Sequence, residues 1–110
     1  MSWKVIYMEQ AEQDLVAIYE YIAFSLLALE TAKNQTERIM DAIATLDEMP
    51  MRHQLYEEEP WHSKGMRYIP VDNYLIFYFT YEVEKVVAIV RIMYGGRNLN
   101  YQLKDSEEKN

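Results

Sequence analysis

Every glycine and every proline of this chain lies at position 50 or later. Gly and Pro are the strongest local breakers of regular structure, so the first 49 residues are predicted to form long elements. Two series of mostly apolar residues repeat there at spacings of three and four: Ala11, Leu15, Ile18 and Ile22, and then Ala32, Thr36, Ile39, Ile43 and Leu46. This spacing is typical of one helix face, and Pro50 ends the second series. We therefore predict two helices joined by a short link around 25–30.

Residues with high β propensity gather outside these helices in four short runs, at 3–7, 66–69, 74–80 and 85–94. The run 74–80 is hydrophobic on both faces, which favours a central strand, and 70–73 is predicted to be a turn. The order β-α-α-β-β-β predicts an α+β two-layer fold, with a helical hairpin packed on a small, mostly antiparallel sheet. At this length we expect one domain over 1–104, followed by a disordered tail at 105–110.

Several classes of function are excluded by what the sequence lacks. Without cysteine, the chain has no disulfides, thiolate metal sites or cysteine nucleophile. No run approaches the ~18 apolar residues of a membrane span, and no secretory signal is visible, so we expect a cytoplasmic protein without a membrane partner. No glycine-rich phosphate loop is present, and the acidic run 57–59 is typical of a solvated loop. We expect neither metal nor other cofactor.

The charge of the chain is divided unevenly between its two halves. The formal net charge is −7, and residues 1–60 hold four basic residues against twelve acidic ones. Residues 61–104 hold six basic residues against three acidic ones. Since phosphate contacts need Lys and Arg, an anionic partner is expected on the second half.

The candidate functional side chains are cationic or hydroxylated and lie on that second half: Lys64, Arg67, Arg91, Tyr94 and Arg97. Arg91 is predicted to share a strand face with Val87, Ile89 and Met93, where a charge should be paired or should face a functional cavity. Arg67 is expected to converge with it on one side of the sheet. A structural salt bridge of Arg91 with an acid is the open alternative. Tyr94, at a strand end beside two glycines, is free to act.

Four segments of the sequence, in order, resemble the RelE/ParE family of toxins from bacterial type II toxin-antitoxin systems. They are Ala11-x-x-Asp14-Leu15-x-x-Ile18-x-x-Tyr21-Ile22-Ala23, Ile43-Ala44-Thr45-Leu46-Asp47-x-Met49-Pro50, Gly65-Met66-Arg67-Tyr68-Ile69-Pro70-Val71-x-Asn73-Tyr74-Leu75-Ile76-Phe77-Tyr78, and Val90-Arg91-Ile92-x-Tyr94-Gly95-Gly96-Arg97-Asn98. The resemblance implies a growth-arresting toxin, neutralised by a cognate antitoxin and associated with roles such as plasmid stabilization. RelE-like members cut mRNA in the ribosomal A site, whereas ParE-like members poison DNA gyrase.

The resemblance also implies roles for the candidate residues in a metal-free endoribonuclease. Cleavage by the ribose 2′-hydroxyl needs a proton acceptor, cations around the phosphorane and a donor to the leaving oxygen. Arg67 and Arg91 would stabilise the phosphate, Tyr94 would stack or move a proton, and Lys64 and Arg97 would bind RNA. His62 or one of Glu57, Glu58 and Glu59 would be the base.

We expect ribosome-dependent mRNA cleavage, with the ribosome and mRNA as partners. Two alternatives stay open: a ParE-like gyrase inhibitor, and an inactive member that binds only its antitoxin. The acidic net charge and the ending Arg91-x-x-Tyr94-Gly95-Gly96-Arg97, which is similar to ParE-like endings, favour the gyrase alternative.

Overall fold

The computed structural model describes residues 2–95 and Leu103. The described chain contains β1 (Lys4–Tyr7), α1 (Glu9–Glu20), the π-helical turn η1 (Tyr21–Ser25), α2 (Leu29–Ala44), the 3-10 turns η2 (Thr45–Asp47) and η3 (Pro50–Arg52), α3 (Trp61–Lys64), β2 (Arg67–Val71), β3 (Tyr74–Tyr81) and β4 (Val86–Tyr94). Both predicted helices and all four predicted strands are present. The tail predicted at 105–110 lies outside the described residues.

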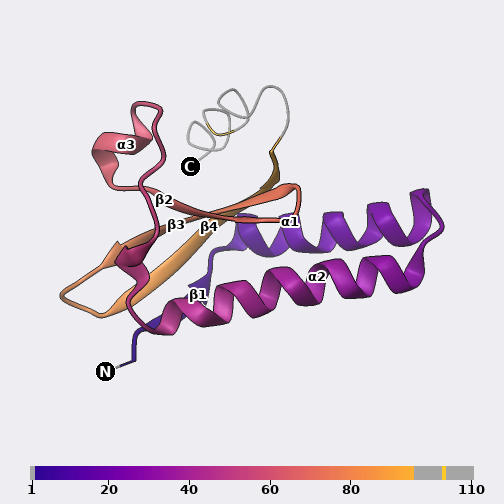
Figure 1. Ribbon diagram of the computed structural model, residues 1–110, viewed down its shortest axis with the longest axis horizontal. Helices are drawn as coiled ribbons and strands as arrows, with labels where there is room; N and C mark the ends of the chain where they lie inside the picture. The colour runs from indigo at the N-terminus through magenta and orange to yellow at the C-terminus, as the bar shows by residue number, and fades with distance from the viewer. Residues whose placement is uncertain (1, 96–102, 104–110) are drawn as a thin grey trace.

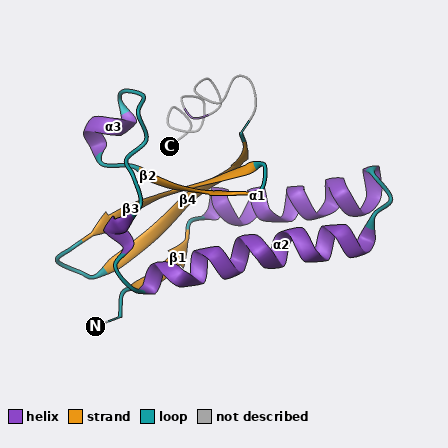
Figure 2. Cartoon of the chain, in the orientation of Figure 1, coloured by secondary structure: helices purple, strands orange, loops and turns teal. Residues whose placement is uncertain are grey.

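The four strands form one sheet in the order β1-β4-β3-β2 (Figure 2). β1 runs parallel to β4, while the β4–β3 and β3–β2 pairs are antiparallel. The predicted two-layer α+β arrangement, its mostly antiparallel sheet and the central position of β3 are therefore confirmed. The parallel β1–β4 pair requires a long crossover, and the helical hairpin is part of it.

The sheet separates two hydrophobic cores. The first lies between the sheet and the two long helices, and it includes Ile39, Ile43, Ile76, Tyr78 and Ile89. The second covers the opposite face, and it consists of Trp61, Met66, Phe77, Met93 and Leu103, with partly buried residues around them. The second core was not predicted, because its lid is α3, a four-residue helix too short to show periodicity in the sequence.

The turn between β2 and β3 is tighter than predicted. Pro70 and Val71 belong to β2, and only Asp72 and Asn73 remain between the strands. A proline fits there because β2 is an edge strand, where a missing backbone donor costs no sheet hydrogen bond on the outer side. Asp72 has a φ of 55°, a left-handed conformation that Asp tolerates better than most residues.

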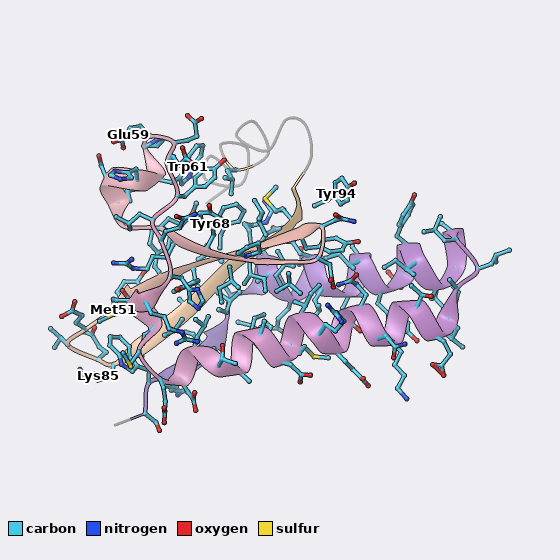
Figure 3. The ribbon with its side chains drawn as sticks, in the orientation of Figure 1. Met51, Glu59, Trp61, Tyr68, Lys85 and Tyr94 are labelled. Carbon is cyan, nitrogen blue, oxygen red and sulfur yellow. The ribbon has the colours of Figure 1, made fainter. Side chains whose placement is uncertain are left out.

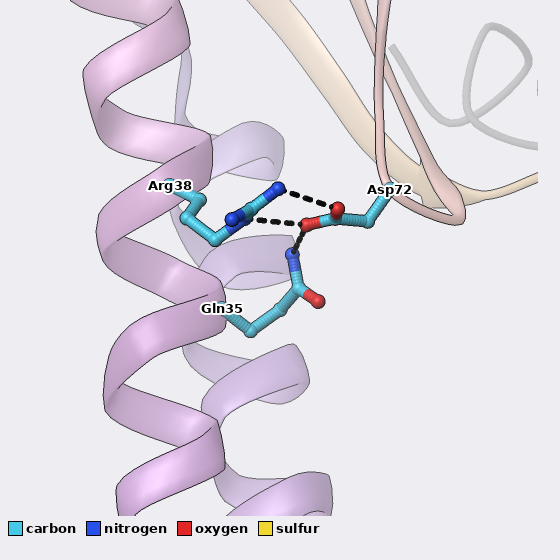
Figure 4. Close-up of polar contacts among 3 residues, drawn as sticks. All are labelled: Gln35, Arg38 and Asp72. Atoms are coloured by element: carbon cyan, nitrogen blue, oxygen red, sulfur yellow. Dashed lines mark hydrogen bonds and ion pairs between the residues drawn. The ribbon is translucent and has the colours of Figure 1, made fainter.

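The helical hairpin extends well past the end of the sheet (Figure 1). Asp72 holds it at the point where the sheet stops: its carboxylate accepts two hydrogen bonds from the Arg38 guanidinium, at 2.8 and 2.9 Å, and one from Gln35 at 2.9 Å (Figure 4). Beyond this contact the hairpin end has a small core of its own, formed by Ile22, Ala23 and Ala32. None of the helices in the described part of the chain is long and apolar enough to cross a membrane.

Candidate functional site

Arg91 is held by Asp14 of α1 in a two-pronged ion pair. The guanidinium donates from Nε and Nη2 to the two carboxylate oxygens, at 2.7 and 3.0 Å. The same carboxylate accepts the backbone N–H of Ile92 at 2.9 Å. Side-chain exposure is only 15% for Arg91 and 12% for Asp14, so both charges are largely removed from water. The salt-bridge alternative for Arg91 is thus present in the structure.

A β-bulge changes the face on which Arg91 lies. The β3–β4 register pairs Tyr78 with Ile89 but Phe77 with Arg91, so that Val90 is an extra residue. Phe77 belongs to the second core, whereas Val87 and Ile89 belong to the first. The prediction that Arg91 shares a face with Val87 and Ile89 was wrong, whereas Met93, a residue of the second core, does lie on the same face as Arg91. Strict alternation fails there because one residue is inserted in the strand.

Arg67 lies on the other face of the sheet. It pairs with Tyr78, whose side chain belongs to the first core, and its Nη1 donates to the backbone carbonyl of His53 at 2.6 Å. Directly paired residues point to the same face, so Arg67 lies on the face of the first core. Arg91 instead pairs with Phe77 of the second core, and its guanidinium contacts Asp14 of α1. The expected convergence of the two guanidiniums is absent from the structure.

Tyr94 stands at the end of β4, 61% exposed, with its ring edge-on to Tyr74 at 5.8 Å. It lies at the opposite end of the sheet from Met51 and Lys85 (Figure 3). Tyr94 pairs with Tyr74 of β3, whereas Arg67 pairs with Tyr78 of the same strand. These two positions on β3 are four residues apart, which corresponds to roughly 13 Å of strand. Tyr94 therefore does not join Arg67 in one site.

Lys64 and Arg91 are the candidate residues that the structure brings together. Both line a cavity of about 550 Å³ on the face of the second core. Its apolar lining includes Trp61, Met66 and Phe79. Arg97, the remaining candidate, lies outside the described residues. The cavity thus combines aromatic side chains with the basic residues Lys64 and Arg91 and the acidic Glu9.

Two of the candidates for a general base, Glu59 and His62, take part in local contacts at α3. Glu59 accepts hydrogen bonds from the backbone N–H and the hydroxyl of Ser63, at 3.0 and 2.8 Å, and these bonds lower the pKa of its carboxyl group. His62 lies 3.8 Å from the Glu59 carboxylate, and both side chains are about half exposed. A carboxyl group with a lowered pKa is a weaker proton acceptor. Within residues 2–95, no three His, Asp or Glu side chains gather as a metal site would require.

His53 is a functional candidate that the sequence reasoning did not select. Its Nε2 is buried without a hydrogen-bond partner among the described residues, and its ring is edge-on to Tyr78 at 6.4 Å. Burial, and then the charges of Arg52 and Arg67, lower the pKa of the imidazole. The neutral imidazole beside Arg67 can accept a proton, although its lowered pKa makes it a weaker base. No sequence feature distinguishes His53 from His62.

The described side chains do not assemble a nuclease centre of the expected composition. Such a centre needs two cations and a proton-transfer group around one phosphate. Here the cations Arg67 and Arg91 lie on opposite faces, and the charge of Arg91 is offset by Asp14.

A comparison with protein-family models supplies the deciding observation. Residues 5–99 match the model described as the ParE toxin of the type II toxin-antitoxin system, parDE. The chain belongs to the ParE toxin family. It is a toxin of a type II toxin-antitoxin system, as the resemblance of its four segments predicted. No curated protein sequence is significantly similar to it.

Solved structures of several toxins and toxin-antitoxin systems share the fold. The chromosomal ParDE system from P. aeruginosa aligns with a TM-score of 0.71 and 19% identity, covering 86% of this chain and 98% of that one. A double-arginine mutant of E. coli toxin RelE in the free state aligns with a TM-score of 0.65 and 12% identity, covering 99% and 97%. The archaeal RelE-RelB complex from Pyrococcus horikoshii aligns at 0.61 and 15%, covering 88% and 99%. At such identities the likeness establishes the fold alone.

Proposed function

We propose that this ParE-family toxin inhibits DNA gyrase by binding to it as a protein, and that a cognate antitoxin neutralises it. The observation that carries the proposal is the separation of Arg67 and Arg91 onto opposite faces of the sheet, with Arg91 neutralised by Asp14. A poison that acts through a protein surface needs no convergent cations. An enzyme that cuts RNA through a phosphorane does.

The charge of the chain supports the same proposal. At −7 the protein as a whole repels RNA, whereas an enzyme that handles DNA presents basic surfaces to which an acidic protein is attracted. The family match points in this direction as well, because its model describes ParE toxins rather than RelE toxins. A gyrase inhibitor would act in the cytoplasm.

A cognate antitoxin is supported by the structural relatives, which include toxin-antitoxin systems from P. aeruginosa and from P. horikoshii. On this chain, we expect the antitoxin on the half 61–104, where basic residues outnumber acidic ones by six to three. An apolar antitoxin segment would fit the cavity that Trp61, Met66 and Phe79 line.

Ribosome-dependent mRNA cleavage is the second candidate, and the same cavity favours it. The aromatic side chains of the cavity offer a surface on which a base can stack, and Lys64 also lines the cavity. In that function Lys64 would contact the RNA backbone, and Arg67 would act from the other face only after a rearrangement of the sheet.

Two assays distinguish the candidates, one with the purified wild-type chain and one with cells that express it. Addition to gyrase and supercoiled plasmid should yield cleaved gyrase-DNA complexes, while primer extension on mRNA from arrested cells should show no new cuts at ribosome-occupied codons. Lys64→Gln and Arg67→Gln are matched variants that should keep gyrase inhibition. Cuts in mRNA that disappear in both variants, with supercoiling unaffected, would reverse the choice.

A further inference from the structure

The end of the helical hairpin is the most apolar exposed region of the described chain. Residues 21–29 contain no charged residue, and Glu20 and Glu30 flank them. Five large apolar side chains there are between 55% and 86% exposed: Tyr21, Phe24, Leu26, Leu27 and Leu29. We call these five residues the tip patch. Adjacent exposed apolar side chains of this number mark interaction sites.

The tip patch is not needed to close the hairpin. Ile22, Ala23 and Ala32 already form a buried core between the two helices at this end. The π-helical turn η1 adds a residue to the helical turn, and Leu26 N–H donates to the Tyr21 carbonyl at 3.1 Å. The backbone of the tip is therefore held from inside, and the tip patch projects from a fixed support.

Leu27 is the residue of the tip patch whose conformation and exposure are least explained by the fold of this chain. Its φ is 54°, a left-handed conformation in which a branched apolar residue is strained and Gly or Asn is favoured. Its side chain is 86% exposed, so the strain is not offset by burial within this chain. A leucine that neither suits its backbone nor packs on its own protein is explained by contact with another molecule.

The surroundings of the tip patch define the chemistry of that molecule. Between residues 9 and 47 the hairpin holds eight acidic residues and two basic ones, and one of the two, Arg38, is paired with Asp72. A second copy of this acidic hairpin, an anionic membrane and RNA would all be repelled. The complementary surface is an apolar pocket with a rim of Lys and Arg on a protein.

We infer that the tip patch inserts into such a pocket on the DNA-handling surface of the toxin's protein target. This inference rests on the proposed function, in which the target is DNA gyrase. Enzymes that hold DNA present Lys and Arg to its phosphates, so the acidic hairpin is attracted to the same surface. The apolar tip then supplies affinity that charge alone does not, because buried aromatic and aliphatic anchors dominate protein interfaces.

Leu27→Asn and Phe24→Gln test the inference, alone and together. Asn adopts the left-handed conformation more readily than Leu, so Leu27→Asn should fold with a melting temperature no lower than that of wild type. The matched control is Val83→Asn, at a 92% exposed valine in the β3–β4 turn, far from the tip (Figure 1). Binding of each purified protein to gyrase and the concentration that yields cleaved complexes are measured together. Each tip substitution should weaken binding about 10-fold and the pair about 100-fold, while Val83→Asn matches wild type.

Each outcome has a distinct meaning. If wild type and tip variants inhibit gyrase equally, the tip inference is overturned and the proposed function stands. If wild type neither binds nor inhibits gyrase, the proposed function falls, and gyrase as the tip's partner falls with it. If the tip variants lose antitoxin binding instead, measured by titration, the antitoxin occupies the tip. If wild type dimerises in sedimentation and Leu27→Asn does not, a second copy of the chain occupies the tip patch.

Discussion

The two ends of the helical hairpin are built from the same helices, yet they differ in which side chains are buried and which are exposed. At the sheet end, a charged pair is buried: Asp14 and Arg91 join α1 to β4, and the Asp14 carboxylate also accepts the N–H of Ile92. At the free end, apolar side chains are exposed around Leu27. The difference indicates that the sheet end stabilises the fold and the free end is kept for a partner. Substitutions should therefore lower stability at one end and activity at the other.

The largest effect on stability is expected from Asp14→Ala. This change leaves the Arg91 guanidinium and the Ile92 N–H without their shared partner, and breaking a buried pair costs about 3 kcal/mol. Urea unfolding followed by circular dichroism measures the loss. Replacing both charges, in Asp14→Leu with Arg91→Met, should recover much of it, because no unpaired charge then remains. A loss below about 1 kcal/mol for Asp14→Ala would contradict a buried pair.

A smaller loss is expected from Tyr78→Phe in the first core. The Tyr78 hydroxyl donates to the Pro50 carbonyl at 2.6 Å, and burial raises the pKa of the phenol to about 12. Without the hydroxyl, that carbonyl loses its donor, which costs about 1–2 kcal/mol. Tyr94→Phe is the matched control, because the Tyr94 side chain is 61% exposed and should lose almost nothing. Equal losses in the two variants would show that burial of the hydroxyl does not matter.

The sheet end also shows which features of the fold could be predicted from the sequence and which could not. The helices and strands were predictable because spacings of three and four, short β-rich runs and the placement of Gly and Pro are local properties. The bulge at Val90 was not, since it depends on how β4 meets β3, and it reversed the face assigned to Arg91. The second core beneath α3 was missed for another reason, since a four-residue helix is too short to show periodicity in the sequence.

The position of Asp14 in the sequence also indicates that it could pair with Arg91, although helical spacing alone does not identify the pair. Asp14 lies three residues after the buried Ala11 and one before Leu15, so it borders the apolar stripe of α1. An acid bordering a buried stripe is a natural partner for an arginine inside a strand. The tip patch was equally visible as an uncharged run at 21–29, but only the structure shows that its apolar side chains are exposed.

At the free end, Leu27→Gly should raise stability slightly. Glycine relieves the left-handed strain, though it also gives the unfolded chain more freedom, so a net gain of about 0.5 kcal/mol is expected. Leu26→Gly is the matched control, because Leu26 has an ordinary φ of −94° and should show no gain. Thermal unfolding compares the two. If Leu27→Gly is destabilised instead, the leucine contributes to the fold, and its role as a partner contact loses support.

The smallest effect on stability is expected at the contact between the sheet and α2, where Asp72 accepts hydrogen bonds from Arg38 and Gln35. This contact lies between the two ends of the hairpin. These bonds, Arg38 first, lower the pKa of the Asp72 carboxyl group below its value in the unfolded chain. The charged carboxylate therefore adds stability above the unfolded pKa of about 3.9, and the contribution is lost as pH falls through the folded pKa. Asp72→Asn removes the titrating group but keeps a residue that suits the left-handed φ of 55°. The difference in unfolding midpoint between wild type and Asp72→Asn should thus be present at pH 6 and shrink below pH 4. A difference that stays constant across this range would mean that the ionised carboxylate does not hold the hairpin to the sheet.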